Sequence, residues 1–230
     1  MFYDLHVNSR LSIGENSVEE MAAMAKRLGL NGIGIVQHYP NISEIDAIDD
    51  IDIVKCIMIK PNNTGELGEI AGKVRNKCEI IMVHGGSYDI NRAACENSLV
   101  DVLCHPELGR KDSGLDHICI KAAHDNDVAM EINFHEILES SRKGRVYILS
   151  AMKKNTELCR RYETPVVTTS GAVTRWDLRS GRELSAITNI LGLDLGSAID
   201  STSFIPDNMV KQNREKLSGK RWQGLSVVEE

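Results

Sequence analysis

Four histidines and one glutamate stand where a parallel β-sheet would gather its reactive groups. His6, His38, His84 and His105 each lie at the end of an apolar run or just after one, and Glu131 lies on another such run. Neutral imidazole and carboxylate are the usual ligands of zinc, manganese and iron, so one interpretation is a metal cluster. The other is a structural network in which the imidazoles hydrogen-bond to loop backbone. The spacing alone leaves both interpretations open.

Other reactive groups give weaker patterns. The six cysteines contain no Cys-x-x-Cys pair, which favours reduced and mostly buried thiols over a metal site. Cys104 adjoins His105 and could suggest a thiolate nucleophile, but a buried thiol at a strand end is the plainer interpretation. The glycines of Gly65-Glu66-Leu67-Gly68 lack the strand–turn–helix spacing of a nucleotide-binding loop.

These side chains need strands to carry them, and seven short apolar runs without strict polar alternation are candidates. Such runs are typical of strands buried on both faces. The predicted strands are Tyr3–Val7, Gly32–Gln37, Ile53–Ile59, Glu79–Val83, Val100–Cys104, Ala129–Asn133 and Pro165–Thr169. The predicted helices alternate with them and are Ser17–Leu28, Gly65–Lys77, Ile90–Asn97, Leu115–Asn126, Arg142–Tyr162 and Arg182–Leu191. Ser17 and Glu20 are spaced for a capping box, and Gly29 is placed for a C-cap.

The alternation of strand and helix predicts an α/β fold built from right-handed βαβ units around a parallel sheet. Seven strands and an uncertain eighth favour a closed or nearly closed (β/α) barrel, similar to a TIM barrel, over an open sheet. We predict one domain over residues 1–218 and a loosely ordered tail over residues 219–230. In such a barrel the chemistry lies at the carboxyl ends of the strands, here called the barrel mouth.

Charge and composition exclude several classes of protein. The 33 acidic side chains exceed the 27 basic ones, and the net charge of −6 argues against coating nucleic acid by bulk attraction alone. The charge is uneven, because residues 141–182 hold ten basic and three acidic side chains, which fits either a phosphate-binding face or a merely solvated one. Without a membrane-length apolar run or a signal-peptide pattern, we expect a soluble cytoplasmic protein.

The first of the apolar runs carries a family resemblance. Asp4-Leu5-His6-Val7-Asn8 is similar to the opening motif of the polymerase-and-histidinol-phosphatase (PHP) family of metallophosphoesterases, which has His-x-His on its first strand. His105-Pro106 and Glu131 also match that family. Asn8 replaces its second histidine, Gln37-His38 replaces its Asp-His, and Ser170-Gly171-Ala172 follows the strand that should end in Asp-x-His.

The PHP resemblance implies a related fold, whereas the lost ligands predict that the metal chemistry is missing. Losing several ligands removes the charge and the directional lone pairs that hold a multinuclear site. The competing interpretation is an autonomous PHP-type phosphoesterase that uses the residual His6, His38, His105 and Glu131.

Later stretches point to a narrower family. They are Glu131-Ile-Asn-Phe134, the long basic segment 142–162, and Thr164 to Arg179 followed by Leu191-Gly192-Leu193. Together they resemble the thirty-kilodalton-subunit family of ribonuclease P, which archaea and eukaryotes share. The similarity runs from Met1 to about Leu217 and is most specific at Ser170-Gly171-Ala172 with Arg175 and Arg179.

The second resemblance implies a protein subunit of the ribonucleoprotein that removes the 5′ leader of precursor tRNA. In that family the RNA is the catalyst, and the protein pairs with ribonuclease P protein component 2 and assembles with further protein subunits. We therefore expect magnesium for the RNA, no cofactor on the chain, and no activity of the isolated chain. His6, His38, His105 and Glu131 would then be vestigial, with no metal bound.

Such a subunit needs cations that face phosphates. Arg175 and Arg179 follow a strand end four residues apart, so they share one face if that turn is helical. Arg92 follows the fourth strand, and Arg110 and Lys111 follow the fifth. These loops would ring the barrel mouth, and the five side chains are the predicted RNA-binding set. For any one of them, a surface ion pair is the plainer explanation.

Overall fold

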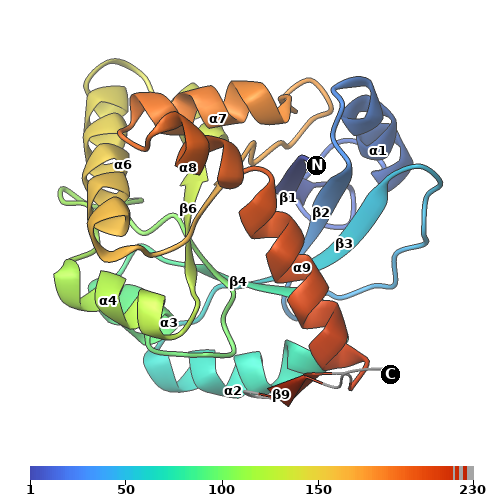
Figure 1. Ribbon diagram of the computed structural model, residues 1–230, viewed down its shortest axis with the longest axis horizontal. Helices are drawn as coiled ribbons and strands as arrows, with labels where there is room; N and C mark the ends of the chain where they lie inside the picture. Colours follow the sequence, from blue (N-terminus) through green and yellow to red (C-terminus); the bar gives the residue numbers. More distant parts are fainter. Residues whose placement is uncertain (220, 223–224, 227–230) are drawn as a thin grey trace.

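Seven parallel strands form the centre of the computed structural model, which describes residues 1–219, 221–222 and 225–226. They pair in sequence order and are β1 (Tyr3–Asn8), β2 (Gly32–His38), β3 (Asp52–Ile59), β4 (Ile80–His84), β5 (Val102–Cys104), β6 (Ala129–Asn133) and β7 (Val166–Thr169). Figure 1 shows helices around this sheet. All seven predicted strands are present, and the predicted (β/α) barrel is confirmed.

The outer strands β1 and β7 meet along a seam that nearly closes the barrel. At the mouth, Val7 forms a parallel bridge with Ala172, which lies just beyond the end of β7. The Asn8 N–H donates to the Ala172 carbonyl at 2.8 Å. The register of β1 against β2 shifts between Asp4 and Val7, so this part of β1 is irregular.

At the other end of the seam, an irregular segment lies between β1 and β7. The Tyr3 N–H donates to the Thr202 carbonyl at 2.8 Å, and the Thr168 N–H donates to the Ser201 carbonyl at 3.0 Å. The described residues contribute no eighth strand to this sheet. Where an eighth strand would lie, the carbonyls of Ser201 and Thr202 accept one hydrogen bond each, from β7 and β1 respectively, and the segment does not pair as a strand.

The helices begin and end where local signals place them. Ser17 and Glu20 form the predicted capping box at α1, and Gly29 just beyond that helix has φ 74°. A second capping box, Ser180 with Glu183, begins α7. The helical elements are α1 (Val18–Arg27), α2 (Thr64–Val74), η1 (Arg75–Lys77), α3 (Tyr88–Cys95), α4 (His117–Asp125), α5 (Phe134–Glu139), α6 (Arg142–Tyr162), α7 (Gly181–Ile190), α8 (Leu195–Asp200) and α9 (Phe204–Leu217).

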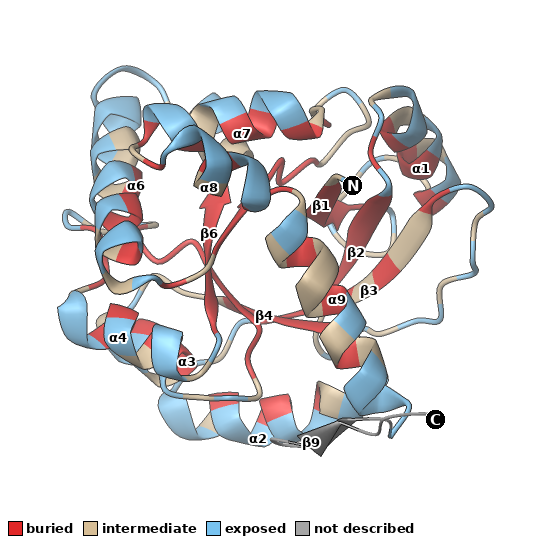
Figure 2. Cartoon of the chain, viewed as in Figure 1, coloured by how far each residue is buried: buried red, intermediate tan, exposed pale blue. Residues whose placement is uncertain are grey.

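The core has an inner and an outer part, because successive side chains of a strand point to opposite faces. On β3, Cys56 and Met58 pack inside the barrel with residues of all six remaining strands of the sheet. Ile57 and Ile59 point outward and pack under α2. Figure 2 shows this division, with buried strands and helices that expose their outer faces. The strands are apolar on both faces for this reason.

Helix α9 crosses the end of the barrel opposite the mouth, which is where β3, β4 and β5 begin (Figure 1). Arg214 makes two hydrogen bonds to the Asp52 carboxylate, at 2.9 and 2.8 Å, and one to Glu79 at 3.2 Å. The Asn213 amide donates to Asp101 Oδ1 at 2.7 Å. Arg214 and Asn213 of this helix thus hold it against the strand starts at the barrel floor.

The tail has only short described pieces. The two-residue strands β8 (Arg221–Trp222) and β9 (Leu225–Ser226) form an antiparallel pair. The remaining residues of the predicted tail beyond Gly219 lie outside the described part of the chain, so the division at residue 218 stays a prediction. Within the described residues, no helix has the length and apolar character needed to cross a bilayer.

Candidate functional site

A buried pair of opposite charges lies at the centre of the barrel mouth. His6 on β1 and Glu131 on β6 meet across the barrel, with His6 Nδ1 2.7 Å from Glu131 Oε1. The same carboxylate oxygen accepts a hydrogen bond from the Thr169 hydroxyl at 2.7 Å and one from the Asn133 amide at 3.2 Å. The predicted convergence of His6 and Glu131 is confirmed, and their direct pairing is a new observation.

The protonation states follow from burial and from this pairing. Burial opposes ionisation of Glu131, but the charge and hydrogen bond of His6 outweigh it and lower the pKa of Glu131 to about 2. Burial likewise opposes the charged form of His6, yet the Glu131 carboxylate raises the His6 pKa above its ordinary value. Burial lowers the pKa of His105 to about 4. The site therefore favours an imidazolium–carboxylate pair beside a neutral imidazole.

The other predicted histidines surround this pair to different degrees. The His105 ring centroid lies 5.6 Å from that of His6 and 5.0 Å from that of His84. His84 Nδ1 lies 3.0 Å from the Gly85 carbonyl, and burial lowers the pKa of His84. Burial also lowers the pKa of His38, with His6 and His84 adding to the effect. His6, His84 and His105 thus form one cluster, and His38 stands at its edge.

The resemblance to metallophosphoesterases requires a test of whether these residues fit a metal. Ligand atoms of His6, His105 and Glu131 lie within 4.8 Å of one another, and they are the one such group in the described part of the chain. Glu131 Oε2 and His105 Nδ1 are buried without hydrogen-bond partners. This set would suit one ion, but it does not fit a multinuclear phosphoesterase centre.

Two positions that depart from the PHP pattern, Asn8 and Gly171, have roles in the local backbone structure. The Asn8 amide donates to the Ala172 carbonyl at 3.3 Å, and Asn8 Oδ1 accepts from the Ser12 hydroxyl at 3.3 Å. Gly171 has φ 63°, and a Cβ atom there would lie 2.2 Å from Asn133 Oδ1. The end of β7 therefore has no room for a ligating side chain at residue 171.

Asp4 is a buried carboxylate that joins the two sides of the seam. Its Oδ1 accepts from the backbone N–H of His6 at 3.3 Å and of Ser170 at 3.1 Å. Burial raises its pKa to about 6, although these hydrogen bonds oppose the change. Asp4 thus supplies acceptors at the irregular part of β1, a structural role that the motif resemblance did not reveal.

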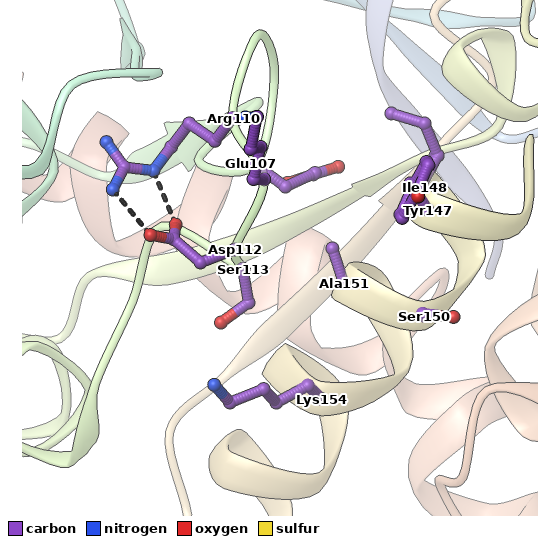
Figure 3. A pocket seen from close by; sticks show the side chains of 10 residues that line it. Glu107, Arg110, Asp112, Ser113, Tyr147, Ile148, Ser150, Ala151 and Lys154 are labelled. Carbon is purple, nitrogen blue, oxygen red and sulfur yellow. Dashed lines mark hydrogen bonds and ion pairs between the residues drawn. The ribbon is translucent and has the colours of Figure 1, made fainter. Parts of the chain in front are cut away.

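A cavity of about 310 Å³ lies between the loop after β5 and helix α6. Arg110 and Asp112 line it as a two-bonded ion pair with distances of 2.6 and 2.9 Å (Figure 3). Figure 3 shows the carboxyl group of Glu107 directed away from Arg110, and burial raises the Glu107 pKa to about 8. Lys111 and Lys154 supply the remaining cations of this cavity.

Arg92 lies in a different neighbourhood. It is in the second turn of α3 and pairs with Glu96 at 2.8 Å. Together with Asn62 and Asn63 it lines a cavity of about 530 Å³ beside the start of α2. Arg110 makes two hydrogen bonds to Asp112, so two of the five predicted cations, Arg92 and Arg110, already hydrogen-bond to a carboxylate. Lys154 is exposed on α6 and lines the same cavity as Lys111.

Arg175 and Arg179 lie on the turn after β7, which is not helical, so they do not share a helix face. Arg175 stacks on Trp176, with its Cζ 4.8 Å from the ring centroid, and lies 3.9 Å from a carboxylate oxygen of Glu20. Arg179 stacks over Phe134 at 5.5 Å and donates to the Trp176 carbonyl. Sequence reasoning missed the exposed Trp176, because a single aromatic residue in a turn has no periodic signal.

The fold defines the class of this molecule as a (β/α) barrel of the PHP type, and in the described part of the chain its one group of potential metal ligands is His6, His105 and Glu131. The histidinol phosphate phosphatase of Lactococcus lactis, solved with zinc, L-histidinol and phosphate, superposes with a TM-score of 0.56 at 11% identity. That match covers 84% of this chain and 94% of the phosphatase, and it supports the fold alone.

The chain belongs to the RNase P subunit p30 family, whose model matches residues 1–218. It is 34% identical over 233 residues to ribonuclease P protein component 3 of Methanosarcina barkeri, covering 100% of this chain and 96% of that protein. A chain of an archaeal ribonuclease P solved by cryo-electron microscopy with mature tRNA matches with a TM-score of 0.77 and 27% identity, covering 98% of both chains. The family expected from the sequence is confirmed.

Proposed function

We propose that this chain is a protein subunit of ribonuclease P that supports the catalytic RNA in removing the 5′ leader of precursor tRNA. The observation that carries the proposal is the state of the barrel mouth. Its ligand set is reduced to His6, His105 and Glu131, and His6 and Glu131 are already paired with each other. The neighbouring family members are named as ribonuclease P components, which supports the same assignment.

The chain's own side chains lack a convincing nucleophile at this site. Burial raises the pKa of the Cys104 thiol well above its ordinary value, so this thiol is not poised as a thiolate. Glu131 is held ionised by His6, and His105 is held neutral by burial. We therefore propose that the isolated chain does not cleave precursor tRNA and that the RNA, with magnesium, performs the reaction.

The RNA contacts that we propose come from the exposed cations of the mouth. Arg175 and Lys111 are better candidates than Arg92 and Arg110, because the latter two make short ion pairs with Glu96 and Asp112. A guanidinium that already bonds a carboxylate has fewer free donors for a phosphate, and Arg110 bonds Asp112 at two atoms whereas Arg92 bonds Glu96 at one. Pairing with ribonuclease P protein component 2, and assembly with other subunits, belong to the same proposal. The six unpaired buried cysteines suit a reducing compartment such as the cytoplasm.

Reconstitution tests this proposal. Ribonuclease P RNA and the other protein subunits are assembled with or without this chain, and cleavage of precursor tRNA is followed over a range of magnesium concentrations. We expect the chain to lower the magnesium requirement, and Arg175→Ala with Lys111→Ala to reverse part of that effect. Arg27→Ala, an exposed arginine at the end of α1, is the matched control. An assembly that is indifferent to the chain would contradict the proposal.

The alternative function is a metal-dependent phosphoesterase, which Glu131 Oε2 and His105 Nδ1 favour because both are buried without a hydrogen-bond partner. Metal-dependent hydrolysis by the purified chain that survives ribonuclease treatment and is lost in His105→Ala would establish it. We expect neither hydrolysis of precursor tRNA nor hydrolysis of a simple phosphate ester by the RNA-free chain.

A further inference from the structure

The turn after β7 presents a large aromatic side chain to solvent between two arginines. Trp176 is 66% exposed, although burying an indole removes a large apolar area from water. Arg175 lies over one face of the ring, and Arg179 Nη1 donates to the Trp176 carbonyl at 2.8 Å. An exposed indole flanked by guanidinium groups at the barrel mouth is not explained by packing within the described chain.

This turn is held in one conformation by its own hydrogen bonds. Asp177 Oδ2 accepts from the Thr174 N–H at 2.7 Å, from the Thr174 hydroxyl at 2.9 Å and from the Val173 N–H at 3.3 Å. The Arg175 N–H donates to Asn16 Oδ1 at 2.9 Å, which ties the turn to the loop before α1. Because the backbone is fixed in advance, little conformational entropy is lost when a ligand meets the indole.

The guanidinium groups of Arg175 and Arg179 beside the indole keep donors that a phosphate could use. Arg175 has its nearest carboxylate, that of Glu20, at 3.9 Å, which is too long for a hydrogen bond. Arg179 donates to two backbone carbonyls through Nη1, those of Trp176 and Leu178. Guanidinium forks in this state can still bind phosphate oxygens.

We propose that an unpaired nucleotide of an RNA binds this turn, with its base stacked on the open face of Trp176 and the flanking phosphates on Arg175 and Arg179. The proposal rests on the proposed function, and it names the kind of RNA element that meets this site. Stacking on an aromatic side chain tolerates any base and requires one that is not stacked in a duplex. A protein partner is less favoured, because covering the indole with apolar groups would also desolvate two guanidiniums.

Intrinsic fluorescence tests the stacking. The chain has two tryptophans, Trp176 and Trp222, so a Trp222→Phe background makes Trp176 the single reporter. The probes are an oligouridylate of about twelve nucleotides and an RNA duplex of equal length. We expect the single strand to quench Trp176 and the duplex to leave it nearly unchanged. Equal quenching by both probes, or quenching by neither, would overturn the proposal.

Affinity measurements separate stacking from charge. Trp176→Ala should weaken oligouridylate binding roughly 5- to 150-fold, the range expected for loss of one stacked base, while Trp176→Phe should keep most of the affinity. The slope of log affinity against log salt should not change, because no phosphate contact is lost. Phe204→Ala is the matched control, since Phe204 is 63% exposed at the start of α9, the helix at the end of the barrel opposite the mouth.

The outcomes also distinguish this inference from the proposed function. If Trp176→Ala leaves RNA affinity unchanged while the salt slope shows phosphate contacts, the chain binds RNA and the stacking proposal is wrong. If the same variant instead weakens assembly with another protein subunit, the turn is a protein-docking site. If neither probe binds at any salt concentration, both the stacking proposal and the RNA-binding part of the proposed function fail.

Discussion

Removing the charge of Glu131 should destabilise the fold strongly. In Glu131→Gln an amide oxygen can still accept the hydrogen bonds of Thr169 and His6, so the variant mainly tests the charge. Lowering the Glu131 pKa from 4.5 to about 2 corresponds to about 3 kcal/mol of stability. That value agrees with the roughly 3–5 kcal/mol for breaking a buried ion pair. For a chain of this size it lowers Tm by roughly 6–12 °C.

The pH dependence supplies the sharper part of this prediction. Because the folded pKa of Glu131 is depressed, its contribution is present above pH 4.5 and is lost as the pH falls toward about 2. The raised pKa of His6 acts in the opposite direction, so its contribution is lost as the pH rises through the folded value. The difference in stability between wild type and Glu131→Gln should therefore be largest between these limits.

Urea unfolding followed by circular dichroism, at a series of pH values, measures this difference. Glu69→Gln is the control, because Glu69 forms an exposed ion pair with Lys73 and should change stability far less. His6→Gln combined with Glu131→Gln completes a double-mutant cycle that isolates the coupling. A cost below about 1 kcal/mol at neutral pH, or a difference that does not shrink in acid, would refute an imidazolium–carboxylate pair at this site.

Three further predictions concern other parts of the barrel. Gly171→Ala should cost roughly 1–3 kcal/mol in urea unfolding, because its φ is positive and its Cβ would meet the Asn133 amide; an unchanged midpoint would argue against the tight end of β7. Native protein should react slowly with a thiol reagent at all six cysteines and rapidly once unfolded, as spectrophotometry will show, since every thiol is buried. Chelator treatment should leave Tm unchanged if the site holds no ion, whereas a fall in Tm together with zinc or manganese in elemental analysis would establish an ion at His6, His105 and Glu131.

The strands were predictable because both of their faces are buried. A strand such as β3 packs Met58 inward and Ile57 outward, so its sequence reads as a continuous apolar run that needs no knowledge of its partners. Helix α9 was not predicted, because Pro206 near its start suppresses the helical signal although proline is tolerated in a first turn. The Ser201–Thr202 segment between the outer strands has no sequence pattern, since it contributes carbonyl groups and no side-chain periodicity.

In the candidate site, too, some features could be predicted from the sequence and others could not. Its position followed from the rule that parallel barrels carry chemistry at strand ends, which brought His6, His105 and Glu131 together correctly. The pairing of His6 with Glu131 could not be predicted, because it depends on where two strands 125 residues apart face each other. The ion pairs of Arg92 and Arg110 likewise depend on rotamers that residue types alone do not determine.

The segment that fills the floor end of the seam has a consequence for how the chain folds. Tyr3 finds its backbone acceptor at Thr202, close to the opposite end of the described chain. Until that residue has been synthesised, the edges of β1 and β7 expose unpaired backbone groups, which are templates for pairing with another chain. Contacts of such long range make closure slow. A chain released before residue 201 should therefore self-associate, whereas in a chain that includes α9 the residue 201–202 segment covers the floor end of the seam.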